Sequence, residues 1–234
     1  MGVTHQVGWL LTSRDPVLEP LPGTRKLMGR MHSLSHLKQM GLALHNYHSV
    51  WGAFPPGASF DRWGQPLHGW QSMLLASLDQ TSIYNQINFQ VAWNGAQNRK
   101  IFQSQLFEYN NPGGTPVAQK NAAGYAFSHY AGNIRVLGGD KSLRVDDFKD
   151  GTAQTIMAGE VATGFKPWGD PLNWRDPALG VNRSPEGFGS TYQEGAQFLF
   201  ADGSVRFIKN SVSLSVMKAL STPASGEQVT SDEY

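Results

Sequence analysis

The chain contains no cysteine among its 234 residues. This absence excludes disulfide bridges, thiolate metal sites and cysteine nucleophiles. Charged residues make up only 16% of the chain, below the usual quarter, and 19 Lys and Arg nearly balance 18 Asp and Glu. The resulting net charge of +1 gives no electrostatic basis for binding nucleic acid or an anionic membrane surface.

Long apolar runs are also absent, because no stretch approaches the ~18 consecutive apolar residues that a membrane-spanning helix needs. Residues 1–23 carry only a brief apolar patch at 7–11, followed by Pro16, Pro20 and Pro22. We therefore expect an irregular leader with no recognisable signal peptide. Taken as it stands, the chain is expected to be soluble.

The common catalytic signatures are missing as well. The sequence has no Gly-x-Ser-x-Gly elbow, no phosphate-binding loop and no Gly-x-Gly-x-x-Gly fingerprint. It has instead 26 Gly, 13 Pro, 7 Trp, 7 Tyr and 12 Phe, a composition that favours turns and strands. The residues alone thus indicate a folded domain without an evident catalytic centre, and no cofactor is expected.

Helical periodicity is strongest near the start of the chain. Residues 25–50 contain no proline, and their apolar residues recur at steps of three and four, which predicts one long amphipathic helix. Shorter helices are expected over 70–87, in two pieces, over 94–103 and over 214–220. The predicted apolar stripe of the long helix consists of Leu27, Met31, Leu34, Leu37, Leu44 and Tyr47.

Alternation of apolar and polar residues, typical of strands, dominates the second half of the sequence. The stretch "AQFLFADGSVRFIKN" (196–210) alternates on both sides of Asp202-Gly203 and predicts a hairpin. "KDGT" predicts a turn between strands at 145–148 and 155–161, and residues 164–195 are expected to form a long surface excursion. Helix first and antiparallel sheet last predict an α+β fold, with 24–234 as one domain.

Candidate metal ligands fall into two groups. His32 and His36, and also His45 and His48, have the spacing that places two imidazoles on one helical face. A zinc site needs a third ligand that the sequence does not offer, so a polar helix face bonded to nearby loops is the simpler interpretation. The calcium candidates are Asp146, Asp150 and Asp202, for which the alternative interpretation is turn formation.

Candidate ligand-binding residues lie in and beside the tryptophan-rich loop 164–195. Trp168 and Trp174 are candidates for stacking on a carbohydrate, which makes a soluble carbohydrate- or ligand-binding module the alternative function. Two carboxylates could also serve a glycoside hydrolase. The carboxylates considered for that role are Glu160, Asp170, Glu186 and Glu194.

Four stretches together resemble a bacterial family, abundant in planctomycetes, that is catalogued as domain of unknown function 1559. They lie in the same order as in the family and cover roughly 25–234. The stretches are "LKQMGLALHNYHSVWGAFPPG" (37–57), "GWQSMLLASLDQTSIYNQIN" (69–88), "VDDFKDGTAQTIMAGE" (145–160) and "GAQFLFADGSVRFIKNSVS" (195–213), the last with "GEQVTSDEY" (226–234) as its tail.

The resemblance implies a protein similar to type IV pilins or type II secretion pseudopilins: a long N-terminal helix packed on a C-terminal antiparallel sheet, with long irregular loops. It further implies a non-enzymatic structural or cell-surface protein of the cell envelope or exterior. The implied partners are copies of itself or other pilin-like subunits.

Two departures from the family pattern stand out. Residues 1–23 lack the prepilin start and hydrophobic half-helix of the family, so membrane association is expected only if such a segment precedes this chain. In the family pattern, nine residues also separate a His from the closing Asp-Gly, and the position of that His is occupied here by Tyr192. Tyr192 is therefore a further candidate for ligand binding.

Overall fold

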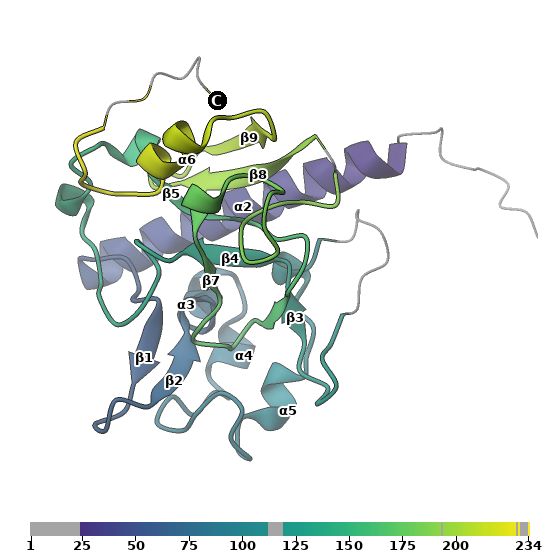
Figure 1. Ribbon diagram of the computed structural model, residues 1–234. Coiled ribbons are helices and arrows are strands. Elements are labelled where there is room, and N and C mark those ends of the chain that lie inside the picture. Colours follow the sequence, from purple (N-terminus) through teal and green to yellow (C-terminus); the bar gives the residue numbers. More distant parts are fainter. Residues whose placement is uncertain (1–23, 112–118, 193, 228, 230–233) are drawn as a thin grey trace, which may run out of the picture.

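The computed structural model describes residues 24–111, 119–192, 194–227, 229 and 234. The predicted leader, 1–23, lies outside the described residues. The fold is α+β, with a long N-terminal helix packed on a mostly antiparallel sheet (Figure 1).

Helix α2, Thr24–Trp51, confirms the helix predicted over 25–50. Gly52 follows it with a positive φ of 75°, and its amide donates to the carbonyl of His48 at 2.8 Å, a common helix ending. Pro55 and Pro56 then prevent the helix from continuing. The shorter helices are α3 (Trp70–Leu74), α4 (Thr81–Tyr84), α5 (Arg99–Phe102) and α6 (Leu214–Leu220).

The main sheet has five strands in the order β7-β4-β5-β8-β9. Every pairing is antiparallel except that of β4 with β7, which is parallel. Its strands are β4 (Tyr130–Asn133), β5 (Ile156–Glu160), β7 (Trp174–Arg175), β8 (Gly195–Phe200) and β9 (Val205–Lys209). Two small antiparallel sheets pair β1 (Ala58–Phe60) with β2 (Pro66–Gly69) and β3 (Phe127–Ser128) with β6 (Lys166–Pro167).

Strand β8 is buried on both faces of the sheet, as its unbroken run of buried residues requires. Leu199 belongs to the core shared with α2, whereas Phe198 and Phe200 belong to the core shared with α6. This alternation follows from the two-residue period of a strand. The sheet is thus the middle layer between α2 and α6, as Figure 1 shows.

The predicted hairpin at Asp202-Gly203 is confirmed. Gly203 has φ of 82°, and the Asp202 carboxylate accepts from the Ser204 amide at 2.8 Å. Both features stabilise the tight reversal between β8 and β9.

The strand predicted at 145–148 is wrong, because Val145–Asp147 forms a single 3-10 turn. The Asp147 carboxylate accepts from the Arg144 amide at 2.7 Å, and this local bond replaces a ladder bond. The neighbouring prediction at 155–161 is confirmed as β5, which pairs with β4 and β8.

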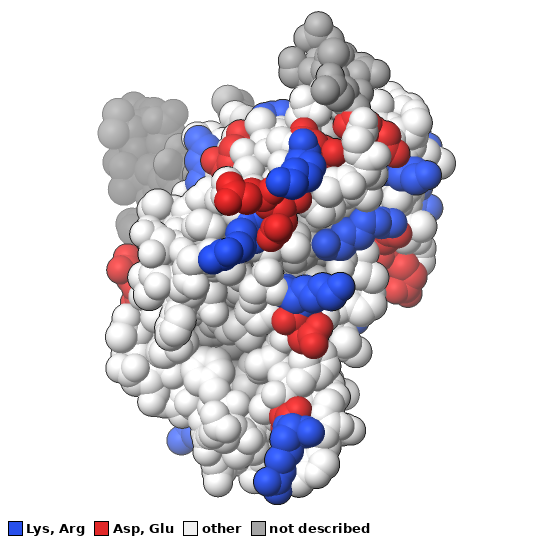
Figure 2. Space-filling model, turned by 90° about the vertical axis from the view of Figure 1, so that its left-hand side faces the viewer, with Lys and Arg blue, Asp and Glu red and all other residues white. Residues whose placement is uncertain are grey.

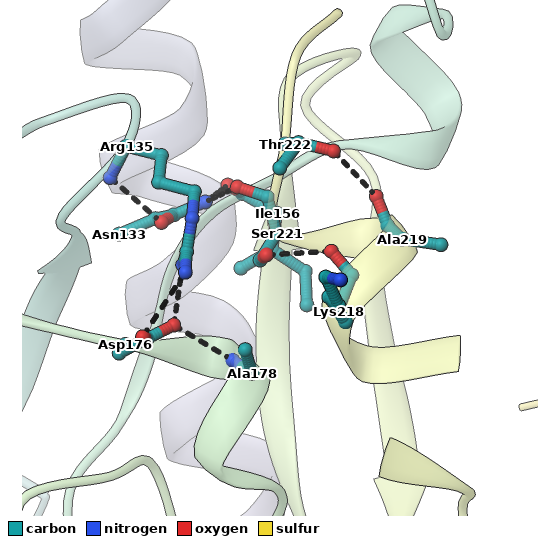
Figure 3. A network of polar contacts seen from close by, with 9 residues as sticks. All are labelled: Asn133, Arg135, Ile156, Asp176, Ala178, Lys218, Ala219, Ser221 and Thr222. Carbon is teal, nitrogen blue, oxygen red and sulfur yellow. Dashed lines mark hydrogen bonds and ion pairs between the residues drawn. The ribbon is translucent and has the colours of Figure 1, made fainter. Parts of the chain in front are cut away.

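Asn133, the last residue of β4, connects the sheet to the end of α6 through hydrogen bonds. Its side-chain amide donates to the carbonyl of Ile156 at 2.7 Å and to that of Ser221 at 2.8 Å (Figure 3). Its Oδ1 accepts from the amide of Arg135, whose guanidinium pairs with Asp176. One fully buried side chain therefore holds β4, β5 and the segment after α6 together.

Candidate functional site

The start of α2 extends beyond the sheet (Figure 1), and its large apolar side chains are exposed. Leu27, Met28 and Met31 are 59%, 50% and 58% exposed. Residues three and four apart share one face of a helix, so these side chains form one patch, which we call the α2 patch. The prediction that Leu27 and Met31 join the buried stripe is wrong, because the sheet ends before it reaches them.

A polar cluster lies buried between this part of α2 and the sheet. At its centre is Glu160, the last residue of β5, which is 1% exposed. Its Oε1 accepts from Nδ2 of Asn111 at 3.0 Å, and its Oε2 accepts from the Gln197 amide at 2.7 Å. We call Arg30, Ser33, Asn111, His129, Glu160 and Tyr192 the Glu160 cluster.

Burial raises the pKa of Glu160 to about 7, because a charged carboxylate loses its hydration there. Polar contacts with Ser33, Gln197 and Asn111 and the positive charge of Arg30 lower the pKa by less. A substantial fraction of Glu160 is therefore protonated near neutral pH.

His129 faces the same region and is 3% exposed. Its Nδ1 accepts from the Asn111 amide at 2.7 Å, so the proton of the neutral ring resides on Nε2. That Nε2 is buried and has no hydrogen-bond partner among the described residues. Burial lowers the pKa of His129 to about 4, which keeps the ring neutral at pH 7.

Arg30 connects the start of α2 to the sheet. Its Nη2 donates to Glu194 Oε2 at 2.9 Å, and its guanidinium lies 4.3 Å from the centre of the Phe207 ring and 5.7 Å from that of Tyr192. Tyr192 is 4% exposed, and its buried hydroxyl finds no hydrogen-bond partner in the part of the chain that the structure describes. Burial raises the pKa of Tyr192 to about 12.

The cavity inside the cluster measures about 20 Å³. This space holds roughly one water molecule, and a sugar ring is far larger. The cluster can therefore hold a proton and position α2. The lining residues are Asn111, His129, Glu160, Val161, Phe165, Ser190 and Thr191.

The structure does not bring the predicted calcium ligands into one group. Asp146 is exposed, and Asp150 accepts from the amides of Ser225 and Gly226. Asp202 caps its own turn and lies 3.8 Å from Arg206. Throughout the described part of the chain, no three His, Asp or Glu side chains converge in a way that would hold a metal ion.

Nor do the four histidines of α2 form one cluster. His36 is buried beside Tyr130 and Phe107, whereas His45 and His48 flank the Phe54 ring at 5.4 and 4.9 Å between centroids. Within the described ranges the Nε2 atoms of His45 and His48 have no hydrogen-bond partner, so packing on Phe54 replaces the expected bonds to loops.

The tryptophan-rich loop 164–195 is in part a core element, contrary to the predicted surface excursion. Trp168 is fully buried against Phe102, with 4.2 Å between ring centroids, and its Nε1 donates to the Ser104 carbonyl at 3.0 Å. It has no exposed face for a sugar. Trp174 is partly buried, with the Lys166 ammonium 5.4 Å from its ring.

The carboxylates considered for hydrolysis have separate structural roles. Glu186 lies 3.9 Å from the guanidinium of Arg175, Glu194 pairs with Arg30, and Asp170 caps the amide of Leu172 at 2.8 Å. Only Glu160 is buried in a polar cluster. Glu160 was predicted as a carboxylate for hydrolysis, and no sequence pattern indicated Asn111 or His129. The one signal for this cluster is that Glu160 ends the largely apolar run "TIMAGE".

No helix in the described ranges combines the length and apolar character needed to cross a membrane. Searches of curated proteins and of solved structures found no match. The family model described as protein of unknown function, domain 1559, matches residues 25–178, from the start of α2 through β7. This match covers about two thirds of the chain, so the protein belongs to the family catalogued as domain of unknown function 1559.

Proposed function

We propose that this protein is a non-enzymatic pilin- or pseudopilin-like structural subunit of the cell envelope or cell exterior. The observation that carries the proposal is the α2 patch, at the end of a 28-residue helix that projects past its own sheet. Exposed apolar patches of this kind commonly mark contacts with other proteins. We propose copies of the same chain as the partner.

The Glu160 cluster supports this role by fixing how the helix leaves the domain. Arg30 and Ser33 come from α2, one turn apart, and their neighbours come from the sheet and its loops. A subunit that transmits contacts through a projecting helix needs that helix held at a defined angle, and buried polar groups supply such directional contacts.

Single-cysteine crosslinking tests the proposal, because the chain has no other thiol. Met31→Cys places one thiol in the patch, and Leu42→Cys, at a residue 64% exposed on the same helix, is the matched control. Under mild oxidation we expect Met31→Cys to form covalent dimers and Leu42→Cys to remain monomeric. Equal yields from the two variants, together with a monomeric wild type in light scattering, would contradict the proposal.

A further inference from the structure

A second surface feature lies at the other end of α2, at Trp51, about 30 Å from Met31 at ~1.5 Å per helical residue. There α2, the β1–β2 hairpin and the segment around α4 enclose a groove of about 630 Å³. This volume falls in the range of ~300–1,000 Å³ typical of small-ligand pockets. The groove is lined by Tyr47, Trp51, Ser59, Phe60, Asp61, Arg62, Trp63, Leu67, Met73, Tyr84, Phe89 and Gln90.

Aromatic rings dominate this aromatic groove, and two of them are unusually exposed. Trp51 and Trp63 are each 69% exposed, although large aromatic rings are normally buried. The partly buried rings of Tyr84 and Phe89 pack against each other with 5.0 Å between centroids. The groove thus offers flat apolar surfaces at its rim and in its interior.

Trp63 is held in place by the hairpin that carries it. Oδ1 of Asp61 accepts from the amides of Trp63 and Gln65, both at 2.8 Å, and Gly64 supplies the positive φ of the turn. The Arg62 guanidinium lies 3.9 Å from the centre of the Trp63 ring. The backbone that carries the ring is therefore fixed before a ligand binds, which reduces the conformational freedom lost on binding.

Polar groups lie among the rings, and several have no partner within the described residues. Arg62 makes no ion pair or hydrogen bond there, the hydroxyls of Tyr47 and Tyr84 make no hydrogen bond, and only Oδ1 of Asp61 is engaged. A purely apolar ligand would remove these groups from water without compensating hydrogen bonds, which is unfavourable. The groove therefore suits a ligand that has both apolar faces and hydroxyl groups.

The charge of the groove favours a neutral ligand. Its lining contains one cation, Arg62, and one anion, Asp61. Figure 2 shows the face that carries the β1–β2 hairpin and the end of α2: charged side chains gather in its upper half, and the lower half is largely uncharged. Neither a phosphorylated nor an acidic ligand finds a basic cluster there.

We infer that this aromatic groove binds a neutral oligosaccharide. The C–H faces of the sugar rings would stack on Trp51 and Trp63, while their hydroxyls pair with Asp61, Arg62 and the tyrosine hydroxyls. This places carbohydrate binding at the β1–β2 hairpin and not in loop 164–195, where Trp168 is buried. The inference does not depend on the proposed assembly, because the groove and the α2 patch lie at opposite ends of the helix.

Titration of the full chain with neutral hexasaccharides tests the inference, with tryptophan fluorescence and calorimetry as readouts. The probes are cellohexaose, chitohexaose, maltohexaose and mannohexaose. We expect at least one to bind with a Kd of ~1 mM or tighter and Trp51→Ala and Trp63→Ala each to weaken binding at least ~10-fold. Phe107→Ala, which removes a ring 61% exposed outside the groove, should leave the Kd unchanged.

Three results would overturn the inference: no binding of any probe at several millimolar, binding that persists in both tryptophan variants, or a wild-type dimer that Trp63→Ala disperses. The last would assign the groove to a protein partner. Circular dichroism of each variant distinguishes loss of a binding ring from loss of fold, because both tryptophans are exposed and their replacement should leave the spectrum intact.

Discussion

The two halves of α2 carry similar apolar residues in opposite environments. In the second half Met40 and Leu44 are fully buried under the sheet, as is Leu37 at the middle of the helix. In the first half Leu27 and Met31 are more than half exposed. Because one helix holds both sets, helical periodicity does not decide which residues reach the core. The difference shows that the extent of the sheet decides where the buried part of α2 ends and its exposed part begins. The Glu160 cluster lies beneath the helix near this boundary.

The largest expected effect comes from truncating one leucine in each half. Leu44→Ala should lower the free energy of unfolding by ~2–5 kcal/mol, because it leaves a cavity in the core. Leu27→Ala should change it by less than ~0.5 kcal/mol. Both variants make the same replacement in one helix, so helix propensity cancels in the comparison. Urea denaturation followed by circular dichroism measures both.

Equal destabilisation by Leu44→Ala and Leu27→Ala would contradict the conclusion that the two halves of α2 differ in burial. It would mean that the first half of α2 is covered in solution as fully as the second. Repeating the measurement over a range of protein concentrations would then identify self-association as the cause, because only association makes the apparent stability depend on concentration.

The next effect concerns the cluster at the boundary between the two halves. The pKa of Glu160 rises on folding from 4.5 to about 7, so the folded state retains a proton that the unfolded state releases as the pH rises through this window. Wild-type stability therefore loses up to about 3 kcal/mol between pH 4.5 and 7 through this group. Glu160→Gln, which does not titrate, should gain stability relative to wild type over the same interval.

In the wild type, the titration of His129 partly offsets the loss of stability that Glu160 causes as the pH rises. Its pKa falls on folding from 6.5 to about 4, so its contribution to stability increases as the pH rises from 4 to 6.5, opposite in sign to that of Glu160. The difference between variant and wild type, measured by urea denaturation at each pH, isolates Glu160. Glu194→Gln, at the surface carboxylate that pairs with Arg30, is the matched control. A pH-independent difference for Glu160→Gln would refute the raised pKa.

Elements defined by local signals could be predicted from the sequence. The uninterrupted periodicity over 25–50, the Asp202-Gly203 turn and the helix over 214–220 all appear where expected. The strand at 145–148 failed because a single carboxylate, Asp147, closes a 3-10 turn that apolar alternation does not reveal.

The Glu160 cluster could not be predicted, because its members come from five segments between Arg30 and Tyr192 that only the tertiary fold joins. Its pKa shifts depend on burial, which no spacing rule encodes. The burial of Trp168 was missed for the same reason: its partners, Phe102 and Ser104, lie more than 60 residues earlier.

The smallest expected effect compares two buried tyrosines, one in the Glu160 cluster and one in the core that contains Met40 and Leu44. The hydroxyl of Tyr192 has no partner among the described residues, whereas that of Tyr109 donates to the Gln71 carbonyl at 2.8 Å. Tyr192→Phe should therefore raise the free energy of unfolding by up to ~1 kcal/mol, because it removes an unpaired buried hydroxyl. Tyr109→Phe should lower it by ~1–2 kcal/mol, since it leaves a buried carbonyl without its donor. Urea denaturation at pH 7 measures both, and a destabilised Tyr192→Phe would show that the hydroxyl has a partner in solution.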